Sequence, residues 1–398
     1  MKRLFFVLTI LLSPFLMQAQ NIKTGVLVIG SGRAAFAATV QANESSVNTT
    51  VLTQSDGFKV NYLFHLNGTG TTKSFIKHAR KVLKLADSLA LPPFNFQMVN
   101  AVIKKWSDSS KTFKVINNVS YTEVKRSGSG WTVKLSNGNS IKAKVLVLAE
   151  PSENLLKVLK ADAITPAKAT TFSYNDNLYR TSIAAFNETN NPNYLSLYNL
   201  LIPNQENLLY LPTDDLEIGQ AAGATAAFAA FFDTKTSLSD LKKIQIELLT
   251  YKGSVMPFDD VKITDSNWLA IQKVGATGLL KGEFKTGRLL FNPDQLVTYN
   301  EIKQPLKDYY YKAQIWFDDH VDVPINLENS ISLVAALGNK SPEATKLALE
   351  KDWLKVYGFK SNFDMKRLLT RREFSALVNV YLNPFDNIQV DKTGRILR

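Results

Sequence analysis

A glycine-containing turn between an apolar strand and a helix constrains this chain more than any other feature. Residues 24–30 form an apolar, β-branched run that ends in glycine, which is typical of a buried strand. The turn continues as Ser31, Gly32, Arg33, Ala34 and Ala35. Gly30 permits a tight bend, Gly32 lets the backbone approach a pyrophosphate, and Ala35 lets the helix pack closely on the strand.

The segments around this turn complete a supersecondary unit. Residues 34–42 read as a helix and residues 48–52 as a second short strand. The amides at the start of such a helix are free to face phosphate groups. Residues 24–52 therefore predict a βαβ unit of the dinucleotide-binding kind, rather than a coincidental strand, turn and helix.

The N-terminus has the pattern of a secretory signal peptide. Lys2 and Arg3 precede an apolar run over residues 4–12, and a polar end follows at 18–20. This run is too short to span a bilayer comfortably, and no later segment has the length and apolarity to do so. We expect residues 1–20 to be removed near Ala19, which leaves an exported chain, periplasmic or secreted, without a transmembrane segment.

Composition narrows the function classes further. The length of 398 residues exceeds what one core usually holds, so two domains are expected. The chain has no cysteine, and its three histidines, His65, His78 and His320, lack ligand spacing, so neither disulfides nor a metal site are expected. The net charge of +12 is clearest on one face of a helix predicted over 72–90, which reads as solvated surface. Export argues against a nucleic-acid partner.

Strand patterns dominate from residue 112 to residue 148. Strands are predicted at 113–116, 119–125, 131–135 and 141–148, and turn-forming segments separate the last three, which indicates a β-meander returning into a central strand. Residues 160–205 are polar and asparagine-rich, with 187–193 especially loop-like. A short buried strand at 208–211, an alanine-rich segment over 219–232 and a helix over 234–249 follow. The composition changes near 250–255, where we expect a domain boundary.

A second group of small residues begins the alanine-rich segment. Gly219, Gln220, Ala221, Ala222 and Gly223 come after the short strand and the acidic pair Asp214 and Asp215. Small residues at a helix start permit close approach of a ligand, and the helix dipole there could stabilise negative charge on a reduced flavin. A close contact between this helix and the sheet is the alternative.

Taken in order, the glycine turn, the meander over 131–148 and the late helix resemble the FAD-dependent oxidoreductase family of exported bacterial proteins, over about residues 24–250. The resemblance implies FAD as cofactor, with the first turn on its pyrophosphate, Gly219 to Gly223 beside the flavin, and Asp214 or Asp215 near the ribityl chain. The candidate cofactor-binding residues are Gly30, Ser31, Gly32, Arg33, Ala34, Ala35, Thr53, Gln54, Asp214, Asp215, Gly219, Gln220, Ala221, Ala222 and Gly223.

Two departures from that family concern the cofactor. Thr53 and Gln54 stand where an acidic residue usually binds the adenosine ribose, and Asp56 comes two or three residues late. After the meander the family has an Ala-Thr-Gly turn, whereas this chain has Ala149-Glu150-Pro151, and Glu150 brings a negative charge toward an anionic cofactor.

No catalytic residues can be assigned from the sequence. Tyr174, Tyr179, Arg180 and Tyr194 lie in the short substrate segment. They could orient a substrate over a flavin, and they are equally expected in ordinary packing.

The C-terminal region resembles degenerate S-layer homology repeats. Trp268 and Trp353 would anchor two small helical modules, and Thr298 and Thr370 would cap a helix in each. In that family a Thr-Arg-x-Glu motif helps bind cell-wall polysaccharide, and only the second unit keeps the arginine, at Arg371. We favour a packed cap on the first domain over a wall anchor.

These observations predict an α/β fold. It comprises a Rossmann-like FAD-binding domain over 21–252, with an inserted β-meander and a reduced substrate region at 152–207, and a small, mainly helical domain over 253–398. Two functions follow. One is an exported FAD-dependent oxidoreductase that transfers a hydride from an unknown small molecule to flavin, and the other is a non-catalytic descendant that binds a cell-envelope glycan or polymer.

Overall fold

The computed structural model describes residues 21–60, 70–89, 95–150, 155, 159, 167–188 and 191–397. The expected signal peptide, His65, Pro151 and most of the expected substrate region before residue 167 lie outside the described residues. Within the described ranges, no helix has both the length and the apolarity that crossing a membrane requires.

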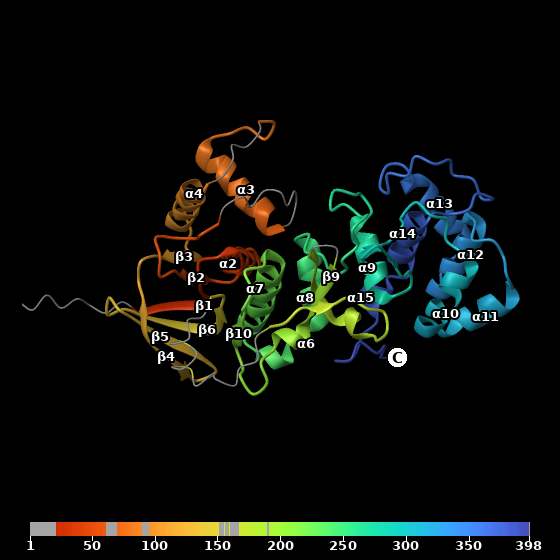
Figure 1. The fold of residues 1–398 in the computed structure, drawn as a ribbon. Coiled ribbons are helices and arrows are strands. Elements are labelled where there is room, and N and C mark those ends of the chain that lie inside the picture. The colour runs from red at the N-terminus through yellow and green to blue at the C-terminus, as the bar shows by residue number, and fades with distance from the viewer. Residues whose placement is uncertain are drawn as a thin grey trace, which may run out of the picture.

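A mixed sheet of seven strands organises the first half of the chain (Figure 1). Its strands are β1 (Asn21–Ile29), β2 (Thr49–Leu52), β3 (Phe113–Ile116), β4 (Tyr121–Ser127), β5 (Gly130–Leu135), β6 (Ser140–Leu148) and β10 (Leu208–Tyr210). The order is β3-β2-β1-β6-β5-β4, and β10 pairs with the C-terminal part of β6. The β1, β2, β3, β6 and β10 pairings are parallel, whereas β4, β5 and β6 form the predicted antiparallel meander. The predicted α/β fold is therefore confirmed.

Both faces of the central strands are buried, which explains their unbroken apolar runs. Val26 and Val28 of β1 belong to a core shared with α2 (Arg33–Glu44) and α7 (Leu216–Phe231). Leu27 and Ile29 belong to a second core with side chains of the meander. The helix α8 (Leu241–Thr250) joins the first core, and a short 3-10 turn, η3 (Thr236–Leu238), precedes it.

The strand β3 lies at the edge of the sheet opposite the meander. It pairs parallel with β2 at the sheet edge. The helix α3 (Gly70–Leu83), which ends before the predicted residue 90, and the unpredicted helix α4 (Phe96–Ser109) precede it. Asn95 caps α4 through a bond from the Met98 amide, and its buried residues Val99, Val102, Ile103 and Trp106 have helical spacing.

A second, three-stranded sheet replaces the loop expected over 187–193. The strands β8 (Ser182–Glu188) and β9 (Asn191–Ser196) form an antiparallel hairpin, and β7 (Thr170–Thr171) pairs with β9. The loop prediction was wrong because the asparagines pair through backbone atoms, while Ile183, Ala184 and Leu195 bury the other end of the hairpin. The short helices η2 (Leu178–Thr181) and α6 (Leu197–Leu200) flank this sheet.

The C-terminal part is mainly helical, as predicted, and lies beside the sheet domain with α7 and α8 between them (Figure 1). Its elements are α9 (Trp268–Thr277), β11 (Glu283–Lys285), β12 (Arg288–Leu290), α10 (Tyr299–Tyr309), α11 (Tyr311–Asp319), α12 (Leu327–Gly338), α13 (Pro342–Asp352), α14 (Arg371–Tyr381) and α15 (Pro384–Asn387). Trp268 and Trp353 are buried in its core. Thr298 and Thr370 cap α10 and α14 in complete capping boxes, which confirms both predicted caps.

Candidate functional site

The glycine turn has the local geometry that its sequence predicts. Gly30 follows β1 with a φ of 149°, a conformation that favours glycine, and its amide donates to Leu52 O at 3.2 Å. A Cβ on Gly30 would lie 3.1 Å from the backbone carbon of Ala149, at the end of β6. The ends of β1, β2 and β6 therefore meet at this turn, and Gly32 is the N-cap residue of α2.

The amides of the turn are occupied by carboxylates of the chain itself. The Ser31 amide and hydroxyl donate to Oε2 of Glu150, at 3.1 and 3.0 Å. The Ala34 amide donates to Oδ1 of Asp214 at 3.0 Å, and Arg33 forms an ion pair with the same carboxylate at 3.4 Å. A Cβ on Gly32 would lie 2.2 Å from Asp214 Oδ1 and 2.3 Å from Glu150 Oε1.

These contacts decide whether a dinucleotide fits. The N-terminus of α2 favours negative charge, and the two carboxylates supply that charge where a pyrophosphate would approach Gly32. A phosphate at this position would compete with Glu150 and Asp214 for the Ser31 and Ala34 amides. It would also be repelled by the two carboxylates, which carry the same sign of charge. The FAD pyrophosphate does not fit this turn while Glu150 and Asp214 hold it.

A cavity of about 380 Å³ lies beside the turn. Gly30, Ser31, Gln54, Lys59 and Glu150 contribute to its lining, and Asp56 does not. Thr53 is fully buried, and its hydroxyl donates to Ser55 O at 2.8 Å and contacts Asn117 Oδ1 at 3.0 Å. Of the two residues predicted to bind a ribose, the structure thus places only Gln54 in the cavity.

The second group of small residues forms a helix-packing surface. A Cβ on Gly219 would lie 2.3 Å from Ala34 O, and a Cβ on Gly223 would lie 2.5 Å from Ala38 O, so both glycines let α7 pack closely on α2. Gln220 is buried and donates to Gln41 Oε1 at 3.0 Å.

The residues around Gly219 and Gly223 do not lie at the cavity beside the glycine turn. Ala221 and Ala222 are fully buried, and Asp215 precedes α7 without a side-chain cap bond. None of the residues 219–223 lines the cavity beside the turn. The close-packing alternative is the one that the structure shows, with α2 rather than the sheet as the main partner.

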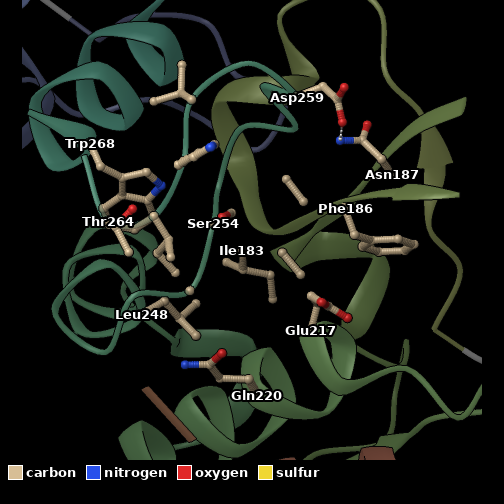
Figure 2. Close-up of a pocket in the computed structure, with 16 residues that line it drawn as sticks. Ile183, Phe186, Asn187, Glu217, Gln220, Leu248, Ser254, Asp259, Thr264 and Trp268 are labelled. Atoms are coloured by element: carbon tan, nitrogen blue, oxygen red, sulfur yellow. Dashed lines mark hydrogen bonds between the residues drawn. The ribbon is translucent and has the colours of Figure 1, made fainter. Parts of the chain in front are cut away.

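A larger cavity, of about 700 Å³, lies between the sheet domain and the C-terminal part; we call it the interdomain cleft (Figure 2). Its lining comes from β8, from Glu217 and Gln220 of α7, from Leu248 of α8, and from residues 253–268. Burial raises the pKa of Glu217 above its ordinary value, and the nearby charge of Asp215 adds to this effect. Asp259 pairs with Arg288 and also accepts a 3.4 Å hydrogen bond from Asn187.

The sequence did not predict the interdomain cleft. Its lining residues come from separate segments that carry no common motif, and Trp268 was predicted only as a core anchor. The local signal is Glu217, which is the one charged residue of α7 and lies in its first turn.

The tyrosines of the expected substrate segment are packing residues here. Tyr174, Tyr179 and Tyr194 surround Phe172, with ring centroids 4.9–5.7 Å apart, and burial raises the pKa of all three. Arg180 donates to Thr277 O at 3.0 Å. None of these four residues lines the interdomain cleft.

Arg371, the residue expected to contact polysaccharide, is buried. It donates to Phe291 O at 2.8 Å and Lys281 O at 2.6 Å, and it forms an ion pair with Glu301. Only 5% of its surface is exposed, so its guanidinium is committed to holding the C-terminal part together.

Comparison with known proteins does not show a family for this chain. No family model matches it, and no curated protein matches it. Among solved structures it is similar to the bacillithiol disulfide reductase Bdr (YpdA) from Staphylococcus aureus, with 12% identity and a TM-score of 0.21 over 33% of this chain and 39% of that one.

Two further solved structures have the same partial likeness. The rebeccamycin biosynthetic enzyme RebC with reduced flavin has 14% identity and a TM-score of 0.25 over 39% of this chain and 37% of that one. Sdh1 of Mycobacterium smegmatis in complex with UQ1 has 13% identity and a TM-score of 0.21 over 33% and 34%. The chain spans less than two-fifths of each of these proteins, so its function has to be inferred from its own residues.

Proposed function

We propose that this chain is an exported, non-catalytic binding protein on a flavoprotein-like α/β fold, and that it does not use FAD. The observation that carries the proposal is the occupation of the Ser31 and Ala34 amides by Glu150 and Asp214. The interdomain cleft, whose volume lies in the range of small-molecule sites, supports a binding role. The burial of Arg371 argues against polysaccharide contact through that residue.

The visible absorption spectrum of the purified mature protein tests this proposal. We expect no flavin bands, and we expect added FAD to leave the melting temperature unchanged. A bound cofactor at a hundred times its dissociation constant would stabilise the fold by about 2.7 kcal/mol, which a thermal melt detects readily. Flavin bands, or a stabilisation of that size, would refute the proposal.

The second candidate is an exported FAD-dependent oxidoreductase acting on an unknown small molecule. The cavity of about 380 Å³ beside the glycine turn favours it, because Gly30, Gln54 and Lys59 border that space. This function requires Glu150 and Asp214 to leave the amides when the cofactor binds. Flavin absorbance in the purified protein would establish it over the first candidate.

A further inference from the structure

The interdomain cleft carries an unpaired carboxylate at one end. Glu217 lies in the first turn of α7, and its side chain borders the cavity near Ile183 (Figure 2). Among the described residues, none forms an ion pair with Glu217. Arg33, whose charge favours the ionised form of Glu217, pairs with Asp214 instead.

The surroundings of Glu217 make its ionised carboxylate unfavourable when no cation lies beside it. The carboxylate is withdrawn from water, and Asp215 and Glu188 add negative potential to it; a hydrogen bond with its own backbone and the charge of Arg33 offset only part of this, so its pKa stays raised. A desolvated charge without a partner is unfavourable, and a bound cation removes that penalty. The other carboxylate of the cleft, on Asp259, already has Arg288 as its partner. Lys262 also lines the cleft but forms no ion pair with Glu217, so a positive charge bound beside Glu217 would offset the burial of its carboxylate.

The rest of the cleft suits an apolar body with a polar end. Ile183, Leu248 and Val261 contribute apolar wall, and Trp268 lies across the cavity from Glu217 (Figure 2). The indole N–H of Trp268 makes no hydrogen bond with a described residue, and the figure shows it turned toward the cavity. It can donate to a ligand oxygen.

From these contacts we propose that the interdomain cleft binds a small organic cation, a protonated amine on an apolar body, with Glu217 as the partner of the ammonium group. This inference rests on the proposed binding function and names its ligand class. The proposed site is separate from the glycine turn, and residues of the C-terminal part form some of its lining.

Tyramine and tyrosol form a matched pair of probes, because they differ only in an ammonium group against a hydroxyl. Titration calorimetry on the full mature protein at pH 7.5 should show tyramine binding, with tyrosol weaker by about tenfold or more because it cannot pair with the carboxylate. The variant Glu217→Gln keeps the side-chain shape and should bind tyramine no better than tyrosol.

Glu328→Gln is the control variant. Glu328 is exposed, does not line the cavity and does not act on the charge of Glu217, so this variant makes the same charge change away from the ligand. We expect it to change tyramine affinity by less than about threefold, since an exposed charge at a distance is largely screened.

Three results would overturn the inference: no tyramine binding at millimolar concentration, equal binding of tyrosol, or undiminished binding by Glu217→Gln. Stabilisation by neutral sugars with no response to tyramine would assign the cleft to a different ligand class. The absorption spectrum separates this failure from the failure of the proposed function, because a flavin-free protein that ignores tyramine contradicts only the ligand class.

Discussion

Neutralising the two carboxylates on the glycine turn should create an anion site that the native chain lacks. In the double variant Glu150→Gln and Asp214→Asn, the side chains keep their shape and their carbonyl oxygens, but the two negative charges beside Gly32 are gone. The helix N-terminus then faces a weaker internal competitor, and an added diphosphate can take the Ser31 and Ala34 amides.

The size of the gain follows from the geometry. Two unit charges 4 Å apart interact by about 1 kcal/mol in water and by about 4 kcal/mol at the effective dielectric of a protein surface. The Asp214 side chain is 46% exposed and Glu150 is also exposed, so the lower figure applies to each carboxylate. Together they contribute about 2 kcal/mol of repulsion, which corresponds to a gain in pyrophosphate affinity of about thirtyfold.

The assay is titration calorimetry with inorganic pyrophosphate and with ADP at low ionic strength. Asp215→Asn serves as control, because that carboxylate lies next in sequence and makes no side-chain cap bond. The double variant should bind both anions, while the wild type and Asp215→Asn bind neither measurably. If the wild type binds pyrophosphate within threefold of the double variant, the carboxylates do not close the site.

Three further predictions concern stability. Gly219→Ala should destabilise the fold by about 1–3 kcal/mol in urea unfolding, because the new Cβ would lie 2.3 Å from the carbonyl oxygen of Ala34 and overpacking outweighs the helix-propensity gain. Arg371→Gln should cost about 3–5 kcal/mol, since it leaves a buried network without its cation, and a smaller loss would contradict the structural role given to Arg371. Burial lowers the pKa of Lys242 to about 8, from 10.5. Below pH 8, Lys242 is protonated in both the folded and the unfolded protein, and the folded protein carries its charge in a buried place. Between pH 8 and 10.5 the unfolded protein binds more protons than the folded one, so the free energy of unfolding rises with pH. Lys242→Met should therefore be more stable than wild type by on the order of 2 kcal/mol at pH 7, with a difference that shrinks by pH 10 in parallel urea titrations.

The sequence predicts an element well where a residue type strongly favours one kind of local structure, such as glycine in a tight turn or threonine at a helix N-cap. The Gly30 turn, the meander and the caps at Thr298 and Thr370 all lie where the sequence placed them. The sequence does not predict the helix α4, although its apolar residues have helical spacing, and the asparagines of β8 and β9 predict a loop because asparagine is common in loops. In that hairpin the backbone pairing decides the structure.

The contents of the candidate site were harder to predict, because they depend on residues far apart in the chain. The sequence predicts that Glu150 brings a charge toward the cofactor position, but its bond to Ser31 spans 119 residues and no local pattern predicts it. Asp214 meets Ala34 across 180 residues, and nothing local distinguishes it from Asp215. The interdomain cleft likewise depends on how two parts of the chain pack, for which no motif exists.

The glycines of the turn have structural uses in this fold that need no cofactor. Gly30 is required by its positive φ and by the backbone of Ala149, neither of which involves a ligand. Gly32 is required for close approach to the helix N-terminus, but two carboxylates of the chain use that approach as a phosphate would. Because the same amides serve either anion, the glycines specify an anion-accepting turn, and the identity of the anion is set by Glu150 and Asp214.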